Sequence, residues 1–237
     1  MSDPAPIAEA RELIRAGRFD AAVDRLVAAL PDLPVEYQRQ ACAYAGLAHY
    51  FAERWAEALG YFRSAADGSE VLEDWFNVAM AQVKSGDVEG AHASWQRAFD
   101  LSYAHEGAPE TSTFFQKKLL FARALRDAGA CDPRGLDLLE RQLLPFFTNY
   151  HVTDASFWGL RGVPALEEVL ATTLDYYRAL GKTPDEWRAL LDRVAAKIDD
   201  DGKAYCEEMK GRWPSDSPSN LRKQAKSTSV ILLACEQ

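Results

Sequence analysis

The feature that most constrains the fold of this chain is a short internal repeat in its first half. Three segments share a turn, a small residue and a large apolar residue at matching spacing. The aligned small residues are Ala22, Ala58 and Ala91, which are 36 and 33 residues apart. A period of about 20 to 50 residues is typical of arrays built from one repeated supersecondary unit. The repeat therefore predicts the architecture of the first half before any single element is assigned.

Each copy has the pattern of two helices joined by a tight turn. A large side chain follows each aligned alanine by four residues, and these side chains are Leu26, Phe62 and Trp95. Positions four residues apart lie on one face of a helix, so the alanine allows the paired helix to approach and the large residue fills the space between hairpins. Because one hairpin cannot bury its apolar face alone, about three stacked copies are needed for stability.

These residues resemble the tetratricopeptide (TPR) repeat, a helix hairpin with a period of about 34 residues. The second copy has Gly46 and His49 where the family has Gly and Tyr, and the third has Trp75 at the leading Trp position and Ala79 in place of Gly. The resemblance covers residues 5–101. It implies an all-α fold, namely a right-handed superhelical array of antiparallel helix hairpins, a TPR-like α-solenoid, with extra C-terminal helices.

A degenerate fourth unit is expected to follow. Apolar residues between positions 114 and 125 have helical spacing, and Gly129 marks a turn. Asp132-Pro133 is a typical helix start, because Asp caps the helix and Pro is tolerated in its first turn. Pro145 is expected to end this helix. Residues 5–147 are thus predicted to be helical repeats, three of them clear and one degenerate.

The second half lacks the repeat. Residues 148–163 show no period, and we expect an irregular stretch that is braced by its own aromatic side chains or, alternatively, acts as a ligand-contacting lid. These aromatics are Phe146, Phe147, Tyr150, Phe157 and Trp158. A helix opened by Pro164 and a second one opened by the capping box Thr183-Pro184-Asp185-Glu186 complete a hairpin within residues 148–201 that packs on the array.

Residues 202–237 are predicted to form a partly irregular tail. Glycine, proline and serine are frequent there, a basic cluster contains Arg222, Lys223 and Lys226, and an apolar run occupies residues 230–233. This apolar end is expected either to dock on the protein's own surface or to be available to a second copy or another protein.

Composition excludes several functions. The chain has 27 Lys and Arg against 36 Asp and Glu, a formal net charge of −9, which repels a phosphate backbone, so nucleic acid is not an expected partner. No segment approaches the roughly 18 apolar residues of a membrane span, and no secretory leader is recognisable. The four cysteines are far apart without a Cys-x-x-Cys pair. These features predict a cytoplasmic protein with reduced thiols.

No pattern of catalytic or metal-binding residues stands out. The four histidines include no pair four residues apart on one helix, and no phosphate loop or dinucleotide fingerprint is present, so neither a metal nor a cofactor is expected. His105 beside Glu106 and His151 near Asp154 could each act as acid and base, but such neighbours are common by chance. We therefore predict that the chain is not an enzyme, and we keep an enzyme built on a helical-repeat scaffold as an alternative.

The TPR resemblance implies a concave groove, lined by the first helix of each hairpin, that holds a peptide. Carried over position by position, the groove residues are Arg11, Arg15, Tyr44, Leu47, Phe51, Asn77, Met80, Lys84, Gln116, Leu120, Arg123 and Arg126. The basic members predict a locally positive groove that favours an acidic peptide, and a solvated helix face is the alternative. The predicted function is an interaction module or adaptor that binds a peptide segment of another protein. A homo-oligomeric scaffold assembled through the C-terminal tail is the alternative.

Overall fold

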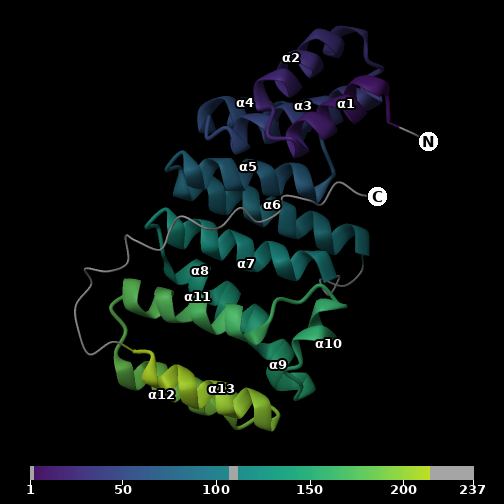
Figure 1. Cartoon of the computed structure of the whole chain (residues 1–237). Helices are drawn as coiled ribbons and strands as arrows, with labels where there is room; N and C mark the ends of the chain where they lie inside the picture. Colours follow the sequence, from purple (N-terminus) through teal and green to yellow (C-terminus); the bar gives the residue numbers. More distant parts are fainter. Residues whose placement is uncertain (1–2, 107–111, 214–237) are drawn as a thin grey trace. The chain divides into compact units, whose positions relative to one another are not determined.

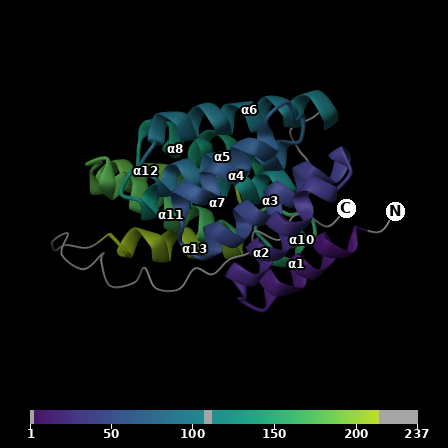
Figure 2. The same cartoon turned by 90° about the horizontal axis from the view of Figure 1, so that it is seen from above.

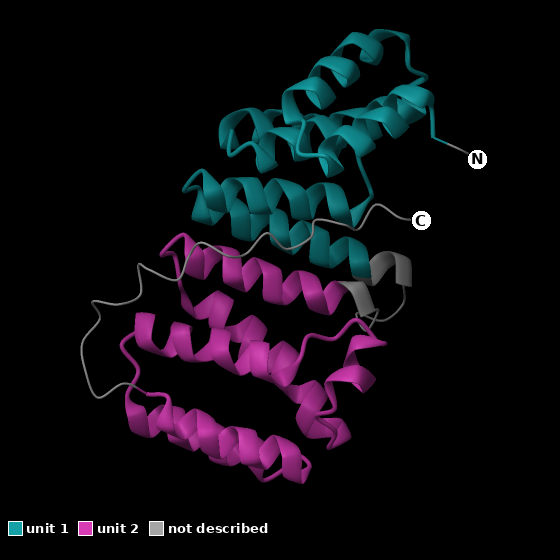
Figure 3. Ribbon diagram, in the orientation of Figure 1, with its two compact units in different colours: residues 1–107 teal, residues 108–237 magenta. Residues whose placement is uncertain are grey.

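The computed structural model describes residues 3–106 and 112–213, and all regular structure in these two ranges is helical (Figure 1). The prediction of an all-helical chain is confirmed. The chain divides into two compact units, residues 1–107 and residues 108–237, which are described separately below (Figure 3). The division falls inside the range 5–147 that the sequence predicts to be continuous repeats.

Unit 1 consists of three successive pairs of helices. The elements are α1 (Ala5–Arg15), α2 (Phe19–Ala29), the 3-10 turn η1 (Leu30–Asp32), α3 (Val35–Phe51), α4 (Trp55–Ala66), α5 (Leu72–Lys84) and α6 (Val88–Glu106). Each helix packs on the next one along the chain, and α1 lies beside α2 in both views (Figures 1 and 2). Each pair is joined by a turn with one residue at positive φ: Gly17, Glu53 and Gly86.

The residues that define the repeat form the core of unit 1. The three aligned alanines have no exposed surface, Leu26 and Phe62 are 1% exposed and Trp95 is 5% exposed. The small residue in α3 is also required, because a Cβ added to Gly46 would lie 2.4 Å from Cδ1 of Phe62. The predicted roles of these positions in packing are confirmed, since small residues allow close approach and large ones fill the space between the helices.

Unit 2 is built around α7 and α11. Its elements are α7 (Ser112–Asp127), α8 (Pro133–Asp137), the π-helical segment η2 (Leu138–Leu143), α9 (Leu144–Tyr150), α10 (Ala155–Gly159), α11 (Leu166–Ala179), α12 (Pro184–Ala195) and α13 (Asp200–Gly211). Helix α7 packs on η2 and on α11, where the hydroxyl of Tyr176 donates to the carbonyl of Ala122 at 2.8 Å. Helices α12 and α13 pack together, and Trp187 Nε1 donates to the carbonyl of Met209 at 3.1 Å.

Two predicted helix starts in unit 2 are confirmed by their capping geometry. The side chain of Asp132 accepts from the backbone N–H of Gly135 at 2.8 Å and begins α8. Thr183 and Glu186 form the reciprocal capping box that begins α12. Both cases satisfy backbone donors that have no partner inside the helix.

Two expectations for unit 2 were wrong. Pro145 does not end a helix, because α8, η2 and α9 follow one another without a break, and Pro145 comes directly after the π-helical turn in which Leu144 N–H donates to the Leu139 carbonyl, a local widening that accommodates a residue without an N–H. Residues 148–163 are not wholly irregular, since α9 extends to Tyr150 and Asp154 caps the short helix α10. Residues 202–211 are helical in α13, which Asp199 caps by accepting from Gly202 N at 3.0 Å. The basic cluster and the apolar run of the tail lie outside the described residues.

Candidate functional site

The predicted groove residues of unit 1 fall into three rows of equivalent repeat positions on α1, α3 and α5. The first row contains Tyr44 and Asn77, the second contains Arg11, Leu47 and Met80, and the third contains Arg15, Phe51 and Lys84. Within each row the residues have the same spacing as the aligned alanines. The members of one row are therefore equivalent positions, and differences in exposure between rows reflect which face of the helices each row occupies.

Apart from Arg11, whose side chain is 32% exposed, the first two rows contribute almost no accessible surface. Tyr44 and Leu47 are 4% and 5% exposed, and Asn77 and Met80 are 6% and 8% exposed. Buried side chains of this kind stabilise the packing of their helices, and a partner could contact them only through the small surface that remains. The sequence alone could not distinguish an open groove floor from a buried one.

Arg11 and Tyr44 are brought together from neighbouring hairpins. Hydrogen bonding to Tyr44 raises the pKa of the Arg11 guanidinium. Arg11 Nη1 also lies 3.3 Å from a carboxylate oxygen of Asp3, whose other oxygen accepts from Gln40 at 3.3 Å. Arg11 is thus part of a polar cluster that joins α1 to α3.

The third row is the exposed one. Arg15, Phe51 and Lys84 are the last residues of α1, α3 and α5. Phe51 is 39% exposed, the Arg15 side chain is 40% exposed, and Lys84 is half-buried. Arg15 pairs with Glu12 at 2.5 Å within the same helix, a type of surface ion pair that contributes little. This row is the accessible part of the predicted groove in unit 1.

Around Phe51 the rings form a continuous series that we call the aromatic ridge: Phe19, Phe51, Tyr50 and Trp55. The ring centroids of Phe19 and Phe51 are 6.0 Å apart, those of Phe51 and Tyr50 are 6.2 Å apart, and those of Tyr50 and Trp55 are 5.0 Å apart. Lys84 Nζ lies 5.7 Å from the ring centroid of Trp55. The ridge therefore runs from α2 to α4 and is continued by a cation at the end of α5.

The sequence contained a signal for this ridge. Phe19 and Trp55 occupy the same repeat position, two residues after the residue at positive φ in each turn. The sequence shows that both residues are aromatic. Only the structure shows that they contact Phe51 and Tyr50 at the end of α3. The ridge links residues that the repeat pattern assigns to different helices of different hairpins.

His49 lies next to Tyr50 in the interior of unit 1. It is 7% exposed and stacks on Tyr61 with ring centroids 5.3 Å apart. Its Nδ1 atom is buried without a hydrogen-bond partner. Burial, followed by the nearby Arg54 charge, lowers the pKa of His49. His49 is thus a packed core residue whose Nδ1 has no hydrogen-bond partner.

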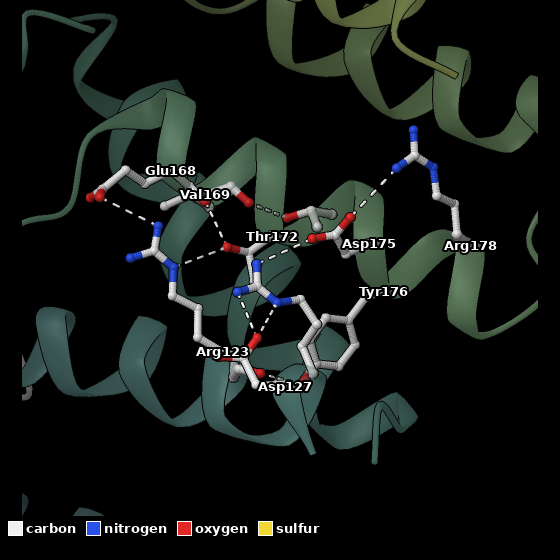
Figure 4. A network of polar contacts seen from close by, with 11 residues as sticks. Arg123, Asp127, Glu168, Val169, Thr172, Asp175, Tyr176 and Arg178 are labelled. Atoms are coloured by element: carbon white, nitrogen blue, oxygen red, sulfur yellow. Dashed lines mark hydrogen bonds and ion pairs between the residues drawn. The ribbon is translucent and has the colours of Figure 1, made fainter. Parts of the chain in front are cut away.

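In unit 2, Arg123 and Arg126 hold α7 to α11. Arg123 Nη2 lies 3.3 Å from Glu168 Oε1, and its Nε lies 3.4 Å from Thr172 Oγ1 (Figure 4). Arg126 donates to Asp127 at 2.9 Å and to Asp175 at 3.1 Å. A partner that binds these guanidiniums would compete with these contacts inside the unit. Of the other predicted groove residues on α7, Gln116 is exposed and Leu120 is half-buried.

The two histidines considered as acid–base candidates are placed differently. His151 is exposed, has a left-handed backbone conformation with φ of 57°, and its Nδ1 contacts the carbonyl oxygen of Lys197. The side chain of His105 lies outside the described residues. Within the described ranges, no group of three or more His, Cys, Asp or Glu side chains is placed to hold a metal ion, and no helix is both long and apolar enough to cross a bilayer.

No protein-family model, curated protein or solved structure matches this chain significantly.

Proposed function

We propose that unit 1 is a TPR-like interaction module that binds a peptide segment of another protein along the aromatic ridge. The single observation that carries this proposal is the continuous contact of four rings from two successive hairpins, in which Phe51 is 39% exposed, Phe19 and Trp55 are half-buried and Tyr50 is buried. Exposed aromatic side chains that are held by their neighbours bury much apolar surface at little cost in conformational entropy, and they are typical anchors of protein interfaces.

The charges beside the ridge favour a peptide with acidic residues. Arg15 and Lys84 end α1 and α5, so both also stabilise the negative ends of their helix dipoles. A carboxylate of the peptide would add a charge-assisted contact to this arrangement. The preference for acidic residues is local, since the whole chain carries a net charge of −9.

The functional assignment is an adaptor or regulatory binding protein without a catalytic step. The accessible row is apolar and cationic, and its chemistry suits recognition by ring contact and ion pairing. A peptide lying across several hairpins would contact the equivalent residue of each, which is how repeat arrays bind extended segments.

The proposal is tested with the triple variant Arg15→Glu, Phe51→Ala and Lys84→Glu. Partners captured from lysate by the wild-type chain are identified, their binding segments are mapped as synthetic peptides, and affinities are measured by fluorescence polarisation. We expect the triple variant to bind at least about tenfold more weakly, which corresponds to about 1.4 kcal/mol. The control Val35→Ser changes a 79% exposed apolar residue in the same unit. Equal affinity of the triple variant and the wild type would refute the proposal.

A further inference from the structure

Unit 2 contains a separate cavity of about 220 Å³ that the ridge proposal does not use. Its lining residues belong to α7, α9, α10 and the segment that follows α10. Five aromatic rings line it, and they belong to Phe115, Phe146, Tyr150, Phe157 and Trp158. Pockets that hold drug-sized ligands measure about 300–1,000 Å³, so this smaller cavity suits a single large side chain better than a cofactor.

Trp158 fixes the wall of this cavity. It is 2% exposed, and its Nε1 donates to the carbonyl of Val152 at 2.7 Å. Its ring centroid lies 5.0 Å from that of Phe157 and 5.6 Å from those of Phe147 and Tyr150. The ring of Phe146 lies 6.3 Å from that of Trp158 and meets the ring of Phe115 edge to face, with centroids 4.1 Å apart. The wall is thus preformed, so binding of a ligand does not require these side chains to lose conformational entropy.

Arg161 supplies a positive charge to the same cavity. Its guanidinium carbon lies 3.7 Å from the ring centroid of Phe157, and Nη1 donates to the Phe157 carbonyl at 3.0 Å. The side chain is exposed, and no carboxylate of the described residues forms an ion pair with it. A stacked guanidinium that already has a fixed orientation is well prepared for a carboxylate. It disfavours a cationic ligand, which the rings alone could have accepted.

Apolar surface continues outside the cavity. Leu160, which directly precedes Arg161, is 88% exposed, and Tyr150 is 56% exposed. The aromatic segment braces this part of unit 2 as the sequence predicted, but bracing does not require a cavity or an exposed leucine. A small organic acid would cover the cavity and leave Leu160 in water, whereas a peptide would cover both.

We infer that this cavity binds an acidic peptide segment of a partner protein, with one large apolar side chain inserted among the rings and a neighbouring carboxylate on Arg161. The site goes beyond the ridge proposal, because it lies in the other unit and shares no residue with it. Leu160 packs on the peptide outside the cavity. A nucleic acid is disfavoured because a single cation in an acidic chain would have to offset the repulsion of phosphates.

The test is a selection of random 12-residue peptides displayed on phage against the immobilised full chain. Recovered peptides are then measured by fluorescence polarisation on the double variant Leu160→Ser and Arg161→Glu, both at exposed positions, and on the control Arg193→Glu, another exposed arginine of unit 2. We expect a class of peptides with a large apolar residue within about three positions of Asp or Glu, since the carboxylate must reach Arg161. These should lose at least tenfold in affinity on the double variant and keep wild-type affinity on the control.

The other outcomes are equally decisive. Peptides that bind the double variant as tightly as the wild type would overturn the inference, and their loss on the ridge triple variant would still support the proposed function. Tight binding of 3-phenylpropanoate without any recovered peptide class would assign the cavity to a small acid and overturn the peptide assignment. Self-association of the wild type that the double variant abolishes, again without recovered peptides, would assign it to a second copy.

Discussion

Gly46 of α3 and Phe62 of α4 approach so closely that a Cβ on the glycine would lie 2.4 Å from the phenylalanine ring. Both residues are buried, and Phe62 is 1% exposed. This contact sets how near α3 and α4 can come. It also explains why the repeat pattern has a small residue at this position, because a larger one would push the two helices apart.

Replacing Gly46 with alanine should destabilise unit 1. Overpacking a core costs about 1–3 kcal/mol, which exceeds the gain of about 1 kcal/mol that alanine brings to a helix interior. The free energy of unfolding is measured by urea denaturation followed by circular dichroism. Gly60 in α4 is the matched control, because a Cβ there meets nothing within 4 Å. Gly60→Ala should stabilise the chain, and a stabilising Gly46→Ala would contradict the packing argument.

Removing the hydroxyl of Tyr176 should destabilise unit 2 by about 1–2 kcal/mol, because the buried carbonyl of Ala122 loses its side-chain donor. Tyr176 is fully buried, so water cannot replace the bond. The measurement is the urea midpoint of Tyr176→Phe. Tyr150→Phe serves as the comparison, since Tyr150 is 56% exposed and the same atom is removed. An equal effect of both changes would show that the Tyr176 hydrogen bond does not contribute.

Arg126→Ala should cost about 1–3 kcal/mol, because it leaves Asp175 partly buried without its main partner on α7. Burial already raises the pKa of Asp175, which indicates that the site disfavours an unpaired charge. Arg141→Ala removes an 82% exposed arginine from an ion pair within one helical stretch and should change stability by less than about 0.5 kcal/mol. Both variants are compared by thermal and urea unfolding. The contacts between α7 and α11 would be dispensable if the two variants behaved alike.

His49 should make the stability of unit 1 fall at mildly acidic pH. Burial lowers the pKa of the folded imidazole below the unfolded value of about 6.5. The unfolded chain therefore takes up the proton first, so the contribution to stability is complete above the unfolded pKa and is lost as pH falls toward the folded pKa. Urea midpoints are measured at pH 7.5 and 5.5 for the wild type and for His49→Tyr. The variant should lose less stability between the two pH values, and an identical loss would exclude His49 as a source.

The repeat predicted unit 1 well because its signal is a packing rule that recurs. Small residues at Ala22, Ala58 and Ala91 and the large ones four positions later specify contacts that only helix pairs can make. The exposure of the groove rows could not be predicted in the same way. Whether Leu47 or Phe51 is accessible depends on residues from other helices, which the spacing of one helix does not contain.

In unit 2 the capping side chains were reliable signals, whereas proline, glycine and tertiary contacts were not predicted correctly. Asp132 and Thr183 identified helix starts through their own side chains. The helix α13 was missed because glycines near both of its ends resemble turn residues. Gly202 is small for another reason, since a Cβ there would lie 2.5 Å from Cγ2 of Thr153. The roles of Arg123 and Arg126 likewise depend on α11, more than forty residues away along the chain.

The most direct test of the central claim, that the aromatic ridge of unit 1 binds a peptide, is hydrogen–deuterium exchange of the full chain with and without a captured partner peptide. Backbone amides exchange when the structure around them opens locally, and a bound ligand slows this exchange because it stabilises the closed state. The account predicts increased protection in peptides covering residues 15–19, 50–55 and 84–88, where the ridge and its flanking cations lie. Unchanged exchange in all three stretches, with protection elsewhere in the chain, would contradict it.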